Sequence, residues 1–279
     1  MPESQGEAST RLTRLLAVEE SDTVTQIVEG EQRRMSGSER PRVLLNMVST
    51  ADGRATLNGR SAPLSGAADR ALFHALRADA DAILVGGATV REERYGRVIK
   101  DPEARRHRVE RGLTPEPLAC IVSGRLLLDA DIPLLAEPEA KVAVITSSDA
   151  NVPGVRAHVD YIRSGSGEGV DLAAALAELS TRFGVGLLLC EGGPHLARQL
   201  LGLGLIDELC LCLSPLLAAG EPATGEALRI FAGAELEPPA ELELLSTFRS
   251  GSYLFLRYEV LSARPRVSRE TTSSSSLAK

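Results

Sequence analysis

Several common features are missing from this sequence. Its 279 residues include no tryptophan, and aromatic residues make up only 3% of the chain. The 43% of residues that are hydrophobic must therefore build a core mainly from Leu, Val, Ile and Ala. No apolar run approaches the roughly 20 residues that a membrane-spanning helix needs, and the polar, acidic N-terminus is unlike a signal peptide. We expect a cytoplasmic protein without a membrane partner.

Lysine is almost absent as well. Of the 31 basic residues, only Lys100, Lys141 and Lys279 are lysines, and the 38 acidic residues bring the net charge to −7 at pH 7. Proteins that bind nucleic acid need a basic surface to neutralise the phosphates. We therefore expect no nucleic-acid partner.

The motifs of several enzyme classes are also missing. The four cysteines have no C-x-x-C spacing and the four histidines do not cluster, so we expect no metal, and we interpret the cysteines as core residues. There is no G-x-S-x-G nucleophile turn, no Walker A motif and no G-x-G-x-x-G fingerprint. The sequence therefore gives no support for acyl transfer, for nucleotide hydrolysis or for a Rossmann-type cofactor site.

What is present is an alternation of short apolar runs and amphipathic segments. The continuous apolar runs indicate strands that are covered on both faces, as in a parallel sheet: Val43–Val48, Ala82–Val85, Leu118–Val122, Val142–Thr146 and Gly186–Cys190. Between them, Ser65 and Asp171 are candidate N-caps, Gly184 is a candidate helix terminator, and Pro194 suits a first helical turn. This pattern predicts an α/β fold of three layers, α/β/α, around a mostly parallel sheet.

The C-terminal part differs from this pattern. Runs at 242–248 and 253–260 flank Arg-Ser-Gly-Ser, which predicts an antiparallel hairpin. We expect an N-terminal extension over residues 1–40, partly disordered or forming a short docked helix, then one domain over 41–261. Residues 262–279, rich in Ser and Thr, are expected to form a disordered tail.

Asp52 lies in the first of three loops that follow predicted strands, where open α/β sheets bind ligands. It precedes Gly53, and its side chain has two interpretations. It either closes an Asp-Gly turn, or it faces a polar ring in a dry pocket, where a raised pKa lets it act as a proton donor.

The other two loops are rich in glycine. In residues 85–91 a strand runs through Gly86 and Gly87 into a helix start, and in residues 190–195 Glu191 precedes Gly192 and Gly193 in the same arrangement. Glycines permit close approach of the backbone, and helix N-termini attract phosphate. Each loop alone is more typical of a plain turn, but two together favour a ligand with a pyrophosphate.

Five short segments resemble the reductase domain of bacterial riboflavin biosynthesis, which has the dihydrofolate-reductase-like fold. They are residues 49–54 (STADGR), 76–82 (LRADADA), 86–91 (GGATVR), 191–194 (EGGP) and 207–209 (DEL). The resemblance covers about residues 41–260. It implies a homodimeric enzyme that takes hydride from NADPH to open the ribose of 5-amino-6-(5-phosphoribosylamino)uracil, or of a related pyrimidine, into a ribityl chain.

The same resemblance assigns the site. Asp52 is the catalytic candidate, and Ser61, Arg77 and Glu191 would face the heterocyclic substrate. The cofactor candidates, with Ser123 and Arg125 placed at the 2′-phosphate, are Met47, Ser49, Gly86, Gly87, Thr89, Val90, Ser123, Arg125, Gly192, Gly193, Pro194 and His195.

Two departures from the family keep alternatives open. The zinc deaminase motifs that are often fused to this domain are absent. Where the family has a Leu-x-x-Arg that binds the substrate phosphate, residues 91–98 read REERYGRV, in which Arg94 and Arg97 are the candidates for the cation. The chain resembles more closely a stand-alone, mostly actinobacterial branch described as pyrimidine-reductase-like. A dihydrofolate or pterin reductase with an apolar mouth, and a non-catalytic NADPH-binding protein, are the alternatives.

Overall fold

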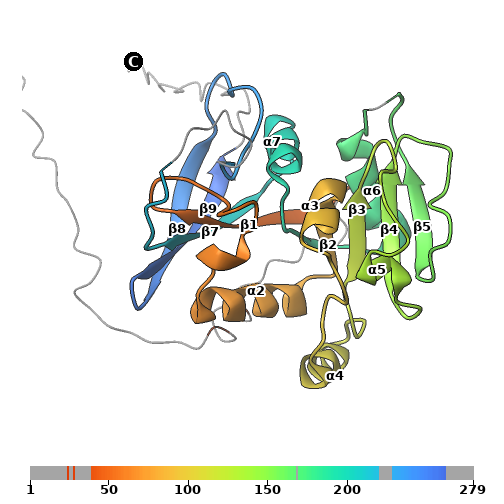
Figure 1. Ribbon diagram of the computed structural model, residues 1–279, viewed down its shortest axis with the longest axis horizontal. Coiled ribbons are helices and arrows are strands. Elements are labelled where there is room, and N and C mark those ends of the chain that lie inside the picture. Colours follow the sequence, from red (N-terminus) through yellow and green to blue (C-terminus); the bar gives the residue numbers. More distant parts are fainter. Residues whose placement is uncertain (1–23, 25–27, 29–38, 168, 220–227, 262–279) are drawn as a thin grey trace, which may run out of the picture.

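The structure is a computed structural model that describes residues 24, 28, 39–167, 169–219 and 228–261. Its centre is a nine-stranded sheet in the order β5-β4-β3-β2-β6-β1-β7-β9-β8 (Figure 1). The strands are β1 (Arg42–Thr50), β2 (Ala82–Gly86), β3 (Leu118–Val122), β4 (Lys141–Thr146), β5 (His158–Arg163), β6 (Leu187–Cys190), β7 (Glu208–Ser214), β8 (Glu241–Ser250) and β9 (Tyr253–Leu261). The helices are η1 (Ala62–Leu64), α2 (Ala67–Asp79), α3 (Gly87–Glu92), α4 (Pro102–Glu110), α5 (Pro133–Ala136), α6 (Leu172–Phe183) and α7 (Pro194–Gly202).

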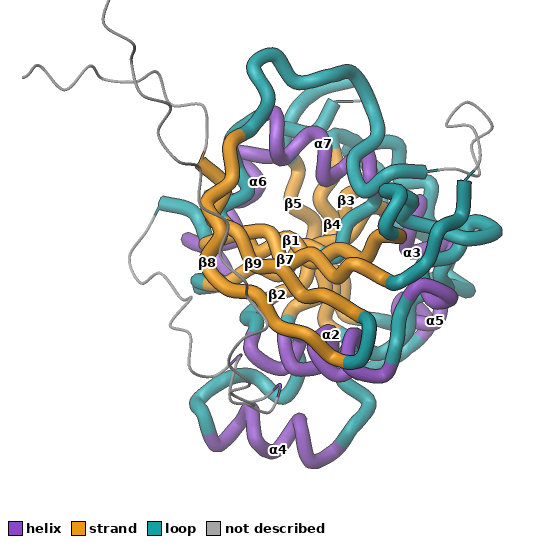
Figure 2. Tube along the Cα trace, turned by 90° about the vertical axis from the view of Figure 1, so that its left-hand side faces the viewer, coloured by secondary structure: helices purple, strands orange, loops and turns teal. Residues whose placement is uncertain are grey.

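Helices cover both faces of the sheet. Residues of α2 and α5 belong to one hydrophobic cluster, and residues of α6 and α7 belong to another on the opposite face. Figure 2 shows the strands between these two groups of helices. Continuous apolar strands suit this arrangement, because the apolar side chains of β2, β4 and β6 are buried on both faces. The prediction of a three-layer α/β fold is confirmed.

The antiparallel end of the sheet is confirmed as well. In the order of the sheet, all neighbouring strands from β5 at one edge to β7 pair in parallel, whereas β9 pairs antiparallel with both β7 and β8. The β8–β9 turn falls at Gly251, as the hairpin signal predicted.

Most of the predicted helix ends agree with the structure. The Asp171 side chain accepts a hydrogen bond from Ala174 N at 3.0 Å, and Gly184 ends α6 with a φ of 67°. The N-cap predicted at Ser65 is wrong, because Gly66 occupies that position and the Ser65 hydroxyl donates to the Asp69 carboxylate instead. Because α2 begins at Ala67, Ser65 lies one residue before the cap position.

The chain ends are described only in part. Val24 and Val28 are helical, and Val28 is buried in the cluster that contains α2. The extension was predicted over residues 1–40, and its other residues up to 38 lie outside the described residues. The predicted tail from residue 262 also lies outside them. Within the described residues, no helix has the length and apolar character to cross a membrane, and all four cysteines are free and buried.

Candidate active site

The two glycine-rich turns meet at the carboxyl ends of the central parallel strands. Gly86 N donates a hydrogen bond to Gly192 O at 3.1 Å, although the two residues lie far apart in the sequence. A Cβ at Gly193 would lie 3.0 Å from Thr89 Oγ1 and 3.8 Å from Gly86 Cα. This contact exists because β6 lies between β1 and β2 in the sheet. The loops are therefore two walls of one crevice.

The turn after β6 can be made only by glycine without strain. Gly192 and Gly193 have φ values of 89° and 75°, a region that other residues rarely adopt. A Cβ at Gly192 would also lie 3.1 Å from Met47 Sδ, and Gly193 is the N-cap of α7, with Pro194 in the first turn. Gly192 is buried and Gly193 is half-buried, and they lead into the N-terminus of a helix, where backbone N–H groups can bind a phosphate group.

Other cofactor candidates lie around this crevice. A Cβ at Gly87 would be 3.1 Å from the Ser123 Cβ, so that the end of β3 adjoins the first glycine turn. His195 is exposed on the first turn of α7, and Arg125 is exposed beyond Ser123. The structure thus brings Met47, Thr89, Ser123 and both glycine pairs together.

Two of the predicted cofactor residues are turned away from solvent. The Ser49 side chain is buried and its hydroxyl donates to Thr50 O at 2.8 Å. Val90 is completely buried in the core beneath α3. For Val90, only the backbone remains a candidate for ligand contact, because its side chain packs inward.

Arg77 and Glu191, predicted to face substrate, bind each other. Arg77 Nε and Nη2 donate to the two Glu191 oxygens at 2.6 and 2.7 Å, and the Tyr95 hydroxyl donates to Glu191 Oε2 at 2.7 Å. The Glu191 side chain is 1% exposed and that of Arg77 is 12% exposed. The Arg77 guanidinium also lies over the Phe73 ring, 4.1 Å from its centre. This cluster joins α2, the loop after α3 and the turn after β6.

The cluster keeps its charges fixed. Burial lowers the pKa of Arg77, but the Glu191 charge and hydrogen bonds outweigh burial and raise it. Burial and the Glu191 charge raise the pKa of Tyr95 well above its ordinary value. Arg77 therefore stays protonated and Tyr95 stays neutral, so that the phenol remains a hydrogen-bond donor to the carboxylate.

Asp52 differs from its prediction. The expected dry pocket and raised pKa are wrong, because the residue is exposed and its carboxylate is fully engaged. Thr50 Oγ1 donates to Oδ1, and the backbone N–H groups of Ala219 and Ala218 donate to Oδ2 at 2.7 and 3.1 Å. The bond from Thr50, followed by those from the backbone, lowers the pKa of Asp52. The carboxylate ties the loop after β1 to the segment after β7.

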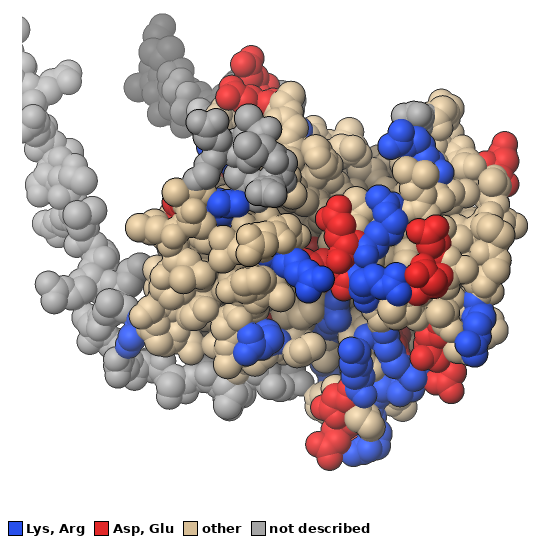
Figure 3. Space-filling model, in the orientation of Figure 1, with Lys and Arg blue, Asp and Glu red and all other residues tan. Residues whose placement is uncertain are grey.

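A cavity of about 690 Å³ lies beside Arg77, between α2 and the start of α4. Ser61 is at its edge, where its hydroxyl donates to Glu93 Oε1 at 3.1 Å. The lining carries four cationic side chains, Arg77, Arg94, Arg97 and Lys100, and two carboxylates, Glu93 and Asp101. In Figure 3, Lys and Arg gather around α3 and α4 on this side of the molecule. The mouth is charged, not apolar.

Arg94 and Arg97, the two candidates for the phosphate cation, are both paired. Arg94 binds Asp131 at 3.1 Å on the surface, while Arg97 binds Glu116 and Glu139. Both guanidinium groups, which line the cavity, are therefore already engaged by carboxylates.

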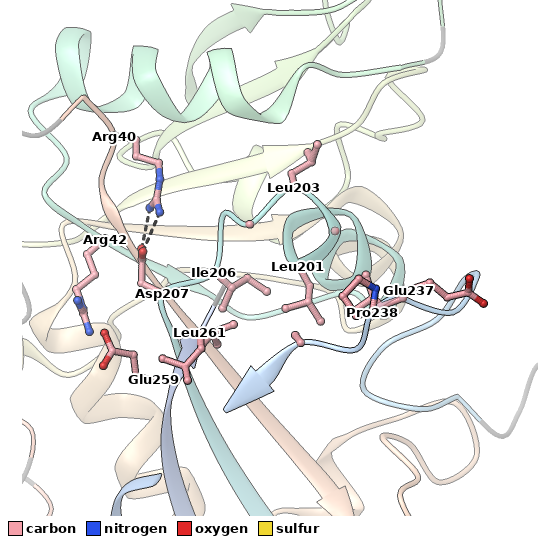
Figure 4. Close-up of a pocket in the computed structure, with 15 residues that line it drawn as sticks. Arg40, Arg42, Leu201, Leu203, Ile206, Asp207, Glu237, Pro238, Glu259 and Leu261 are labelled. Atoms are coloured by element: carbon pink, nitrogen blue, oxygen red, sulfur yellow. Dashed lines mark hydrogen bonds and ion pairs between the residues drawn. The ribbon is translucent and has the colours of Figure 1, made fainter. Parts of the chain in front are cut away.

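Another hollow lies at the opposite edge of the sheet, where β1 and β7 begin. In Figure 4 the Arg40 guanidinium points at Asp207, and Leu201, Ile206 and Leu261 line the space beside them. Asp207 accepts both guanidinium bonds, at 2.7 and 2.8 Å, and also a bond from Val43 N. The 207–209 segment of the family resemblance therefore holds the sheet together at its amino edge and does not contact the crevice.

Sequence analysis assigned no role to Tyr95 or Lys100. Tyr95 lies in residues 91–98, where the chain departs from the family pattern, so no motif identified it. The departure of residues 91–98 from the family pattern was the one signal in the sequence that could have directed attention to Tyr95.

Comparison with known proteins gives a consistent result. The family described as the RibD C-terminal domain matches residues 41–254. A 2,5-diamino-6-ribosylamino-4(3H)-pyrimidinone 5′-phosphate reductase of Methanothermobacter thermautotrophicus is 30% identical over 228 residues, which cover 79% of this chain and 99% of that protein. A reductase of the same name from Archaeoglobus fulgidus is 32% identical over 184 residues, 65% of this chain and 83% of that protein. The crystal structure of a pyrimidine reductase-like protein of Corynebacterium diphtheriae has a TM-score of 0.67 and 27% identity, over 86% of this chain and 99% of that one.

Proposed function

This chain belongs to the RibD C-terminal domain family, and on that premise we propose that it is an NADPH-dependent reductase of a phosphoribosylamino-pyrimidine in riboflavin biosynthesis. Hydride adds to the anomeric carbon of the ribose, the bond from this carbon to the ring oxygen breaks, and that oxygen takes up a proton. The sugar becomes an open ribityl chain. The nicotinamide supplies the hydride, and the residues of this chain hold the two reactants in contact and exclude water.

The observation that carries the proposal is the hydrogen bond between the two glycine turns, Gly86 N to Gly192 O. It joins two backbone segments that suit a diphosphate at the edge of the sheet where α/β folds bind ligands. Met47, Ser49 and Thr89 border the nicotinamide end in this proposal, and Gly192, Gly193, Pro194 and His195 lie under the pyrophosphate.

The residues of the charged cavity are assigned to substrate. Ser61 and Arg77 line it, and Glu191 lies behind Arg77, to which it is bound. We assign Asp52 a positioning role, because its carboxylate is ionised and saturated by hydrogen bonds. Ser123 and Arg125 are assigned to the 2′-phosphate that distinguishes NADPH from NADH.

The curated relatives are named for the 2,5-diamino-pyrimidinone, whereas the resemblance in the sequence pointed to the 5-amino-uracil. The two compounds differ in the group on one ring carbon, an amine in the first and a carbonyl oxygen in the second. We take the diamino-pyrimidinone phosphate as the first candidate substrate and the uracil as the second.

NADPH oxidation, measured with both pyrimidine phosphates and with dihydrofolate in parallel, tests the proposal. We expect turnover with a pyrimidine phosphate and none with dihydrofolate. Turnover of dihydrofolate alone would replace the substrate class, and binding of NADPH without turnover of any pyrimidine would remove the enzymatic function.

The cofactor site has its own test in Gly193→Val. This change combines an unfavourable φ of 75° with a contact at Thr89, in the space assigned to the pyrophosphate. We expect NADPH titration to show loss of binding. Gly112→Val is the matched control, because Gly112 has a φ of 77° and open space around it, so this variant carries the same backbone strain and should keep its NADPH affinity. Unchanged binding by Gly193→Val would place the cofactor elsewhere.

We also propose that the protein forms a homodimer and is located in the cytoplasm. The outermost strand β8 exposes neighbouring apolar side chains, Leu242, Leu244 and Leu245, on a sheet edge whose backbone is open to pairing. Four free buried cysteines suit a reducing compartment.

A further inference from the structure

One cation in the lining of the charged cavity beside Arg77, the exposed Lys100, forms no ion pair with the described residues. Arg77 is paired with Glu191, Arg94 with Asp131, and Arg97 with Glu116 and Glu139. Lys100, in contrast, makes no hydrogen bond or ion pair with any described residue, although it lines the same cavity. It is one of only three lysines in the chain.

Neither of the two carboxylates of the lining forms an ion pair with Lys100, and each has a hydrogen-bond donor of its own. Glu93 accepts both the backbone N–H and the hydroxyl of Ser61. Asp101 is the N-cap of α4, where it accepts a bond from Glu103 N at 2.9 Å. An anion that enters the cavity therefore meets Lys100 without displacing an existing partner.

His74 lines the same cavity, one turn before Arg77 on α2. Burial lowers the pKa of His74, and the positive charges of Arg77, Lys100 and Arg70 lower it further against the opposing charge of Glu191. Since Arg77 already neutralises Glu191, the net potential around the imidazole is positive. A dianion placed between His74 and Lys100 would reduce this repulsion and favour the protonated imidazole.

We propose that Lys100 and His74, with the charge of Arg70 nearby, bind the 5′-phosphate of the ribosylamino substrate across this cavity. The inference rests on the proposed function, because it takes the substrate to be a phosphate monoester. It replaces Arg94 and Arg97 as the phosphate cations. It puts the sugar phosphate at the outer end of the cavity, with Arg77 as the wall toward Glu191 and the glycine turns.

Ribose 5-phosphate is the probe for the first experiment, since its binding needs no turnover. We expect Lys100→Met to weaken its binding, measured by calorimetry, by about tenfold or more, the effect of losing a charge-assisted hydrogen bond. Lys141→Met is the matched control, because Lys141 is an exposed lysine at the start of β4 and lies outside the cavity lining. Equal affinities of the two variants would overturn the assignment.

The second experiment separates this inference from the proposed function. The ratio of kcat/KM for the phosphorylated substrate to that for its dephosphorylated form should fall about tenfold in Lys100→Met and stay constant in Lys141→Met. An unchanged ratio in an active enzyme would refute the phosphate site and leave the reductase intact. If no pyrimidine is reduced at all, the proposed function fails. The comparison of ribose 5-phosphate affinity between Lys100→Met and Lys141→Met still tests the phosphate site in that case.

Two further measurements identify the source of the phosphate and the role of His74. The NADPH-to-NADH affinity ratio should be the same in Lys100→Met as in the unmodified protein, and a reduced ratio would reassign Lys100 to the cofactor 2′-phosphate. From pH 8 to 7, where a phosphate monoester stays mainly dianionic, affinity for ribose 5-phosphate should rise in the unmodified protein and stay flat in His74→Gln. A pH dependence that survives His74→Gln would exclude the imidazole.

Discussion

At the scale of single residues, the cluster of Arg77, Glu191 and Tyr95 shows how a buried charge is kept in place. Glu191 is nearly inaccessible to water, so each of its oxygens needs a donor. Arg77 supplies a forked pair of donors, and Tyr95 supplies another from the loop after α3. Because Glu191 directly precedes Gly192, the position of the glycine turn depends on this network.

Removing the Tyr95 hydroxyl tests that dependence. We expect Tyr95→Phe to lower the free energy of unfolding by about 1–3 kcal/mol, since a buried carboxylate oxygen loses a donor, and to weaken NADPH binding as the turn loosens. Urea denaturation and NADPH titration measure the two effects. Tyr258→Phe should change neither, because no hydrogen bond joins the Tyr258 hydroxyl to the described residues. A Tyr95→Phe variant as stable as this control would contradict the role given to the phenol.

Asp52 predicts a pH-dependent loop. Hydrogen bonding lowers the folded-state pKa below the ordinary value of 3.8. Its stabilising bonds are therefore complete above that ordinary value and are lost as the pH falls through the lower folded value. Hydrogen exchange should show Ala219 N–H protection that is constant from pH 7 to about 4 and declines below it. Asp52→Ala should abolish the protection at every pH, while Arg42 N–H, bonded to Gly186 O, serves as the internal control.

Single site residues were predictable where a short motif contained them, but their partners were not. Sequence analysis selected Arg77 and Glu191, yet their mutual pairing depends on two elements more than a hundred residues apart. Likewise, Asp52 was identified, but the amides that lower its pKa belong to Ala218 and Ala219, which no local pattern connects with it. Burial and pKa depend on such distant contacts.

At the scale of elements, α2 carries His74 and Arg77 and is closed at its end by a side chain of another helix. Arg108, in α4, is completely buried. Its Nη1 donates to the backbone oxygens of Ala78 and Ala80 at 2.9 and 2.7 Å, and to that of Arg77 at 3.2 Å. The last carbonyl groups of a helix have no partner within it, and a cation there also complements the helix dipole.

Arg108→Met should therefore destabilise the protein by about 3 kcal/mol, because several buried carbonyl groups lose their donor. Thermal and urea denaturation measure the loss. Arg106→Met on the same helix is the control: Arg106 is exposed, and its one ion pair with a described residue is a surface pair with Glu103, which contributes about 0.5 kcal/mol. Similar stability of the two variants would mean that water replaces the Arg108 contacts.

Elements with a strong local pattern were predictable, and those without one were not. The runs at β2, β3 and β6 and the caps of α6 agreed with the structure. Strand β5 was missed because its residues alternate with charged and polar ones at the sheet edge, and only Ile162 is buried. Helix α4 was missed because it has almost no apolar face, and depends on the Asp101 cap and on Arg108.

At the scale of the whole molecule, the antiparallel hairpin gives the sheet an outer edge that carries exposed leucines. If β8 is the dimer surface, Leu244→Lys should convert the dimer to a monomer, since it puts a charge at a half-exposed apolar position on that edge. Light scattering after size-exclusion chromatography measures the mass. Val109→Lys on α4, at a similarly exposed apolar residue, should leave the mass unchanged. A dimer that tolerates the Leu244 change would have to use another face.

The fold class and the antiparallel end were predictable from the sequence, because hydrophobic patterns report how many faces of a strand are covered. The order of the strands was not, because it depends on which crossovers pack together. The sequence therefore indicated two glycine turns at one edge of the sheet, but not that they would touch.

The placement of β6 has a consequence for synthesis on the ribosome. Strands β1 and β2 follow each other in the chain, yet they are neighbours only through β6, which is translated about a hundred residues later. A nascent chain that ends before β6 leaves a vacant slot in the middle of its sheet, with unpaired backbone on both sides. Ligands can stabilise the fold only late, after this strand has inserted, and until then the unpaired strand edges favour aggregation.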